Sequence, residues 1–221
     1  TGGGATNAAV SFSRLGFTTH TCFKIGDDQQ GHWIIKELKK HNITVHALTS
    51  PTHPTGISFI ISPIGGDRVI FAHRGANVTL TSHEIPQDII KTVNCVYITS
   101  LSNNAATCLL NICKTARKQK ITVATNPGAS QLSQQSHILK EALPFIDMLI
   151  LNTTEMRMFM NNEQGSLTSV LHDYFTTLFS QGISIAAVTD GARGVYVATP
   201  QKRLFHPALK TNIVNTVGAG D

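Results

Sequence analysis

The chain has 221 residues, of which 41% are hydrophobic and 14% are charged. This length and apolar content are enough to bury a sizeable core in one α/β unit, so no second globular domain is required. Lysine and arginine outnumber aspartate and glutamate by 18 to 13, and the basic residues form no stripe interleaved with aromatic side chains. The charge distribution therefore suits small anionic ligands and argues against nucleic-acid binding.

The cysteine pattern and the hydropathy exclude further classes of protein. Cys22, Cys95, Cys108 and Cys113 include no Cys-x-x-Cys pair, which argues against a zinc knuckle or a disulfide framework and favours a reducing, cytoplasmic location. No apolar run reaches the roughly 18 residues of a membrane span, and the first residues lack the pattern of a signal peptide. The ten histidines are dispersed, which favours surface or satisfied core positions over a metal cluster.

Strand-like and helix-like segments alternate along the chain, which is typical of a mostly parallel central sheet covered by helices on both faces. The predicted strands are residues 18–25, 43–48, 95–99, 121–124, 148–151 and 183–188. The predicted helices are residues 7–15, a segment after Asp28 that carries Trp33, Ile34, Ile35 and Leu38, and residues 104–118, 131–143, 153–160 and 166–180. Connections of this length join parallel strands.

One segment breaks this alternation. The β-rich runs 56–61 and 68–73 are joined by Ser62-Pro63-Ile64-Gly65-Gly66-Asp67, so the sequence predicts a hairpin with glycine at its tip. We interpret residues 55–76 as an inserted β-hairpin that contributes to a lid. The alternative is an ordinary edge hairpin of the main sheet.

The end of the chain, Val217-Gly218-Ala219-Gly220-Asp221, joins a run of small residues to one carboxylate. Small residues let backbone N–H groups approach an anion closely, and a helix beginning here would add the positive end of its dipole. Asp221 would then lie beside an anion hole. The alternative is a tight turn in which Asp221 caps the following helix.

Three further motifs accompany this ending. They are Gly2-Gly3 with Asn7 and Leu15-Gly16, the box Asn152-Thr153-Thr154-Glu155, and the box Thr189-Asp190-Gly191-Ala192-Arg193-Gly194. In this order, and with residues 215–221, they resemble the signatures of the ribokinase/PfkB family of carbohydrate kinases. The resemblance covers almost the whole chain and implies one ribokinase-like α/β domain over residues 1–221 with a small β lid.

The resemblance implies a kinase that uses ATP and Mg²⁺ to phosphorylate a hydroxyl of a sugar or sugar-like alcohol. Phosphoryl transfer needs positioning, charge neutralisation and a base. The family match makes Asp221 the general base and the N–H groups of Gly218, Ala219 and Gly220 the anion hole. It further implies that Asn152 and Glu155 order Mg²⁺ and its waters, and that Asn152, Thr189, Gly191 and Gly194 bind the nucleotide. For the Asn152 box, the alternative is a strand end followed by a glutamate at a helix N-terminus. For the Thr189 box, the alternative is a plain hairpin connection.

For the acceptor, the resemblance implies that Gly2 and Gly3 allow close backbone approach and that the Asn7 amide bonds vicinal hydroxyls, with Arg74 beside the lid completing the pocket. Asn215 replaces the aspartate that many members carry, which leaves activation by a monovalent cation in doubt. The resemblance also allows a homodimer formed through the lid. From the charge pattern and the hydropathy we expect no nucleic-acid or membrane partner.

Other functions stay open. A nucleoside kinase of the same fold and a non-catalytic sugar- or nucleotide-binding module are alternatives, whereas a Rossmann dehydrogenase is disfavoured because no G-x-G-x-x-G follows a strand with an acidic residue about 20 later. Compared with the family, the chain lacks the first core strand, with its substrate-binding aspartate, and the adenine-binding loop. We therefore expect residues 1–221 alone to be inactive.

Overall fold

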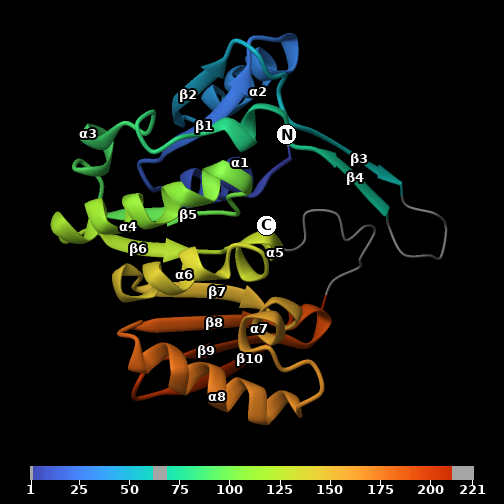
Figure 1. Cartoon of the computed structure of the whole chain (residues 1–221), viewed down its shortest axis with the longest axis vertical. Helices are drawn as coiled ribbons and strands as arrows, with labels where there is room; N and C mark the ends of the chain where they lie inside the picture. Colours follow the sequence, from blue (N-terminus) through green and yellow to red (C-terminus); the bar gives the residue numbers. More distant parts are fainter. Residues whose placement is uncertain (1, 62–68, 211–221) are drawn as a thin grey trace. The chain divides into compact units, whose positions relative to one another are not determined.

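The computed structural model of the chain describes residues 2–61 and 69–210. Its contacts divide these residues into two compact units, whose elements are labelled in Figure 1. Unit 1 comprises residues 2–61, 69–85 and 103–105, and unit 2 comprises residues 86–102 and 106–210. No helix in this part of the chain is long and apolar enough to cross a membrane.

Unit 1 contains a helix–strand–helix–strand run followed by a hairpin. Its elements are α1 (Gly4–Arg14), β1 (His20–Gly26), α2 (Gln29–Lys39), β2 (Thr44–Ser50), β3 (Ile57–Ile61), β4 (Val69–His73) and the 3-10 helix η1 (Gly75–Thr79). β1 and β2 pair in parallel, as the length of their connection predicts. Ala9 of α1, Leu38 of α2 and Ile43 form one buried cluster, which holds both helices against this pair of strands.

The hairpin of β3 and β4 forms a two-stranded antiparallel sheet of its own, with Phe59 opposite Phe71. Every residue of the two strands is exposed, although most are large and apolar. Within the described residues the hairpin is therefore separate from the six-stranded sheet, unlike the edge hairpin that the sequence also allowed. The predicted glycine-containing tip at residues 62–67 lies outside the described residues.

Unit 2 is built on a six-stranded sheet with the order β10-β9-β8-β7-β6-β5 (Figure 1). The strands are β5 (Cys95–Ile98), β6 (Thr122–Thr125), β7 (Met148–Asn152), β8 (Ile185–Thr189), β9 (Gly194–Ala198) and β10 (Arg203–Pro207). β5 to β8 are parallel, as predicted, whereas β9 and β10 continue the sheet antiparallel. Leu149, Leu151, Ala186 and Val188 are fully buried in the two central strands, which explains their apolar sequence.

Both α-helices and 3-10 helices (labelled η) connect these strands. They are α3 (Gln87–Ile90), η2 (Asn103–Thr107), α4 (Cys108–Lys118), α5 (Ala129–Leu132), α6 (Ser136–Ala142), η3 (Leu143–Phe145), α7 (Thr153–Met160), α8 (Leu167–Ser180) and η4 (Gly191–Arg193). α8 buries Val170, Tyr174, Phe175 and Leu178 at helical spacing, as its sequence predicts. Its N-terminus is capped by the Ser166 hydroxyl, which accepts a hydrogen bond from the Ser169 N–H.

Two predicted helices differ from the structure. The segment 104–118 begins as the 3-10 helix η2, and the segment 131–143 is split into α5 and α6. The break lies at Ser133, whose backbone is not helical, with ψ −87°. The Ser133 hydroxyl donates to the Ala129 carbonyl. Serine side chains compete in this way with the regular helix ladder, so a polar run of serine and glutamine can end a helix within an otherwise continuous periodic pattern.

Candidate functional site

The carboxyl ends of the parallel strands β5 to β8 carry most of the predicted nucleotide-site residues that the structure describes. Asn152 is the last residue of β7 and Thr189 the last residue of β8, and the two are opposite each other in the register of the sheet. The structure thus places the Asn152 box and the Thr189 box side by side. In open α/β sheets, ligands bind outside this carboxyl edge.

Asn152 and Glu155 form a reciprocal capping box at the start of α7. The Asn152 side-chain oxygen accepts from the Glu155 N–H at 2.8 Å, and Glu155 Oε2 accepts from the Asn152 N–H at 2.8 Å. Burial raises the pKa of the Glu155 carboxyl, against the effect of these hydrogen bonds. The box satisfies N–H groups that the helix leaves unpaired. The alternative of a strand end followed by a helix N-terminal glutamate thus describes the local structure of this motif. A role in nucleotide binding would be additional to this capping role.

The Thr189 box is the turn between β8 and the antiparallel β9. Gly191 has φ 52° and Gly194 has φ 138°, values that glycine adopts without strain. A Cβ on Gly194 would lie 2.1 Å from the His206 carbonyl oxygen, so close backbone packing also requires glycine there. The hairpin-connection interpretation therefore holds for the local structure of this motif.

Asp190 and Arg193 stabilise this turn, although neither is among the predicted site residues. The nearly buried Asp190 carboxylate accepts from Arg193 Nε at 2.6 Å and from Nη2 at 2.7 Å, which lowers the pKa of Asp190. Thr153, at the start of α7, is a smaller cause of the lowered pKa of Asp190. An acid and an arginine three residues apart within a glycine-rich turn were the signal for this pair.

Side chains also tie together the loops that follow β5, β6 and β7. Gln131 Oε1 accepts from the Leu101 N–H at 2.8 Å and from the Gly128 N–H at 3.2 Å. The Asn126 amide donates to the Ile150 carbonyl at 2.8 Å. Asn126 directly follows β6, and its amide joins the ends of the neighbouring strands β6 and β7. The carboxyl edge of the sheet is therefore held by a connected set of hydrogen bonds.

The predicted acceptor residues lie in unit 1. Gly3 precedes α1 with φ 102°, its carbonyl accepts from the Asn7 N–H at 3.1 Å, and the half-buried Asn7 lies in the first turns of the helix. Gly2 is exposed, and its carbonyl accepts from the Thr6 hydroxyl at 2.8 Å. Arg74 is exposed and directly follows β4, where its carbonyl accepts from the Asn77 N–H at 3.2 Å. Gly2 and Gly3 precede α1, Asn7 lies in its first turn, and Arg74 follows β4.

The glycine-rich ending, residues 215–221, lies outside the described residues. The predicted base Asp221 and the anion hole of Gly218, Ala219 and Gly220 thus stay predictions. The same holds for the inference drawn from Asn215 about a monovalent cation.

The two predicted Mg²⁺ residues, Asn152 and Glu155, lie among the described residues. No group of three histidine, cysteine, aspartate or glutamate side chains in the described part of the chain could hold a metal ion. Asn152 and Glu155 supply the amide and carboxylate oxygens that Mg²⁺ prefers, and Mg²⁺ commonly keeps several waters and binds substrate phosphates. These two residues fit an ion held mainly by water and phosphate oxygens, rather than one enclosed by protein ligands.

Comparisons with known proteins agree with this architecture. The family model for pfkB family carbohydrate kinase matches residues 1–221. Ribokinase of Staphylococcus aureus (strain COL) is 26% identical over 229 residues, which cover 100% of this chain and 71% of that protein.

Among solved structures, adenosine kinase from Anopheles gambiae in complex with P1,P4-di(adenosine-5) tetraphosphate matches with a TM-score of 0.88 and 18% identity, over 100% of this chain and 70% of that one. A putative ribokinase II from E. coli in complex with ATP and Mg²⁺ matches with a TM-score of 0.83 and 15% identity, over 98% and 71% of the two chains. These matches confirm the predicted ribokinase-like α/β fold.

Proposed function

The chain belongs to the PfkB family of carbohydrate kinases, and on that premise we propose that it transfers a phosphoryl group from ATP to a hydroxyl of a sugar or sugar-like alcohol. The observation that carries the proposal is the register of β7 and β8, which sets Asn152 beside Thr189. Asn152 and Thr189 belong to two family motifs and are 37 residues apart in the sequence, and they meet at the edge where α/β sheets bind ligands.

The nucleotide side of the site is assigned to these two motifs. The Gly191 and Gly194 turn lets the backbone come close to phosphate oxygens, and the N-terminus of α7 directs its positive dipole end toward the same edge. When bound, Mg²⁺ would neutralise charge on the phosphates, with Asn152 and Glu155 orienting its waters. The E. coli neighbour that was solved with ATP and Mg²⁺ supports this choice of cosubstrate.

The acceptor side is assigned to Gly2, Gly3, Asn7 and Arg74, with the hairpin of β3 and β4 as a lid. Asp221 would take the proton from the attacking hydroxyl, and the N–H groups of residues 218–220 would stabilise the charge that develops on the transferred group. A preorganised anion hole of this kind supplies much of the catalysis in phosphoryl transfer, since the reaction needs little covalent chemistry from the protein.

A nucleoside kinase is the second candidate. It is favoured by the fold similarity to the Anopheles adenosine kinase, which has the highest TM-score of the structures compared above. The S. aureus ribokinase, with 26% sequence identity, favours a free sugar.

The test is a coupled ADP-release assay of the full-length protein against a panel of sugars, sugar acids and nucleosides, with ATP and Mg²⁺. We expect ADP release with one class of acceptor, and no release without Mg²⁺. A matched isothermal titration of the same panel serves as control. A ligand that binds without any ADP release would establish the non-catalytic binding module instead.

A further inference from the structure

The hairpin of β3 and β4 joins the rest of unit 1 through a root with a buried centre. We define the root as Pro54–Gly56, where the chain enters β3, and Arg74–Glu84, where it leaves β4. Every residue of the two strands is exposed, whereas Thr55 is 7% and Ala76 0% exposed. An exposed two-stranded sheet therefore projects from a closely packed attachment.

Asp28 holds the entering side of the root. Its Oδ1 accepts from the Thr55 hydroxyl at 2.6 Å and its Oδ2 from the Thr55 N–H at 2.7 Å. Thr55 Oγ1 also accepts from the Gly26 N–H at 3.0 Å. The hydrogen bond from the Thr55 hydroxyl is the largest cause of the lowered pKa of Asp28. A charged acceptor makes such hydrogen bonds short and strong, so Thr55 is fixed through both backbone and side chain.

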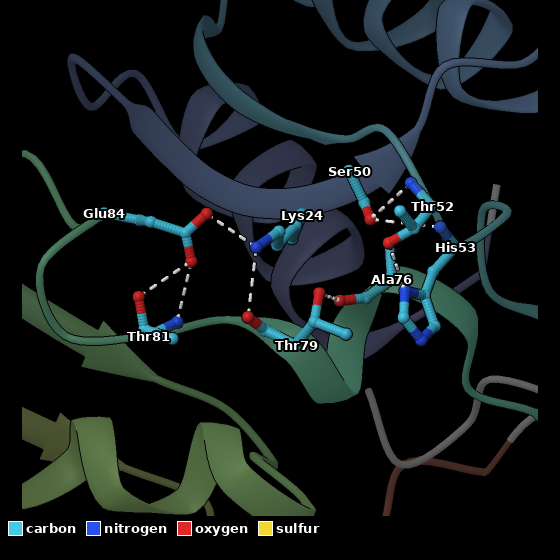
Figure 2. Close-up of polar contacts among 8 residues, drawn as sticks. All are labelled: Lys24, Ser50, Thr52, His53, Ala76, Thr79, Thr81 and Glu84. Atoms are coloured by element: carbon cyan, nitrogen blue, oxygen red, sulfur yellow. Dashed lines mark hydrogen bonds and ion pairs between the residues drawn. The ribbon is translucent and has the colours of Figure 1, made fainter.

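Lys24 holds the leaving side, as Figure 2 shows. Its Nζ, on a side chain only 8% exposed, donates to Glu84 Oε1 at 2.6 Å and to the Thr79 carbonyl at 3.0 Å. Glu84 Oε2 in turn accepts from the N–H and the hydroxyl of Thr81, each at 2.9 Å. The Thr79 hydroxyl donates to the Ala76 carbonyl at 2.8 Å. A continuous set of bonds thus runs from β1 to the residues that follow β4.

The two sides of the root are also joined to each other. The Ala76 N–H donates to the Pro54 carbonyl at 2.8 Å, and a Cβ on Gly75, which has φ +51°, would lie 2.2 Å from the same carbonyl. A Cβ on Gly26 would lie 2.7 Å from the Thr55 nitrogen. Lys24 and Asp28 lie on either side of Gly26, so the end of β1 anchors both entry and exit of the hairpin.

We propose that Asp28 and Lys24 are positioning residues that fix the root of the β3–β4 hairpin and so set its orientation for acceptor binding. The proposal rests on the proposed function, in which this hairpin is a lid. Neither residue contacts the acceptor in this proposal. Each acts through the root, Asp28 through Thr55, and Lys24 through Thr79 and Glu84.

Thr55 allows the positioning role to be separated from a role in helix capping. Asp28 also caps α2, because its Oδ1 accepts from the Gly31 N–H at 2.8 Å. Thr55→Val removes the hydroxyl and leaves this cap in place, and Thr55→Ser restores the hydroxyl. Asp27→Asn is the matched control, since the Asp27 side chain is exposed and its Oδ1 lies 3.8 Å from His32 Nε2.

The first measurement is amide hydrogen exchange of the full-length protein without ligand. We expect Thr55→Val and Lys24→Met to speed exchange at residues 55–57 and 74–77 by about tenfold, as the loss of a buried hydrogen bond implies. Thr55→Ser and Asp27→Asn should exchange as wild type, and α2 should stay protected in Thr55→Val. Unchanged root amides, or fraying of α2 to the same degree, would overturn the proposal.

The second measurement separates this proposal from the proposed function. With the acceptor found in the ADP-release assay, Thr55→Val and Lys24→Met should raise the KM for the acceptor by about tenfold and leave the KM for ATP within about twofold. A loosened root with an unchanged acceptor KM would contradict a positioning role. If wild type phosphorylates no acceptor, the kinase proposal fails, while the exchange data still decide whether these residues fix the root.

Discussion

Asp221 is the proposed general base, and the reaction needs one because the alcohol must lose its proton as it attacks the phosphoryl group. We expect Asp221→Asn to lower kcat by about 10²- to 10⁴-fold, the usual range for a general base, and to leave nucleotide affinity nearly intact. Steady-state kinetics and ATP titration measure the two quantities. Turnover near the wild-type value would remove Asp221 from the mechanism.

The Lys24–Glu84 pair gives a second prediction at the scale of single residues. Lys24 is 8% exposed and Glu84 33% exposed at their side chains, with 2.6 Å between Nζ and Oε1. Glu84→Leu leaves the lysine charge uncompensated, so we expect a loss of about 2 to 4 kcal/mol in the free energy of unfolding. Replacing both charges, Lys24→Met with Glu84→Leu, should recover most of it, because the burial cost of both ions disappears.

Urea unfolding of wild type, both single variants and the double variant forms a complete cycle for this pair. A double variant as unstable as Glu84→Leu alone would show that the ion pair itself, rather than the stranded charge, determines stability here.

At the scale of elements, the start of α7 has two separable roles. Glutamine accepts the Asn152 N–H as well as glutamate does, so Glu155→Gln keeps the capping box. We therefore expect unchanged or slightly higher stability at pH 7, together with a kcat lower by about tenfold or more if the carboxylate orders Mg²⁺. Equal activity would leave Glu155 with the capping role alone.

The pH dependence of this variant follows from the raised pKa of Glu155, whose main cause is burial. A carboxyl with a higher pKa in the folded state binds its proton more tightly there, so it contributes stability below its unfolded pKa. That contribution is lost as pH rises through the folded value. The stability of wild type relative to Glu155→Gln should therefore fall in thermal melts as the pH rises above the ordinary glutamate pKa of about 4.3.

The elements also show what the sequence could and could not predict. The strand at 148–151 and the helix at 153–160 were predictable, because apolar periodicity and capping signals are local. β9 and β10 were missed, since each is short and residues 203–207 are exposed throughout, which leaves little periodicity. The bonds from Asp28 to Thr55 and from Lys24 to Glu84 join residues 27 and 60 apart. Such pairs depend on tertiary packing, and no local pattern in the sequence indicates them.

At the scale of the whole molecule, the hairpin presents two apolar faces. Phe59 and Phe71 are opposite each other and are 63% and 58% exposed. Alternation along the strands puts Ile57, Ile61 and Val69 on the same face as these rings, and Ile60 and Ile70 on the other. Exposed apolar patches of this kind mark interaction sites. In the proposed lid role one face covers a small acceptor, and we propose that the larger Phe59 face pairs with a second copy of the chain.

We therefore expect a homodimer formed through the Phe59 face. Phe59→Asp should shift sedimentation velocity of the full-length protein from dimer to monomer, because a charge in an apolar interface is left without a partner. Ile60→Asp, on the opposite face of the same strand, is the matched control: it should stay dimeric and raise the KM for the acceptor instead. A wild-type monomer at every concentration tested would contradict the homodimer. A dimer that survives Phe59→Asp and dissociates with Ile60→Asp would show that the Ile60 face forms the interface instead.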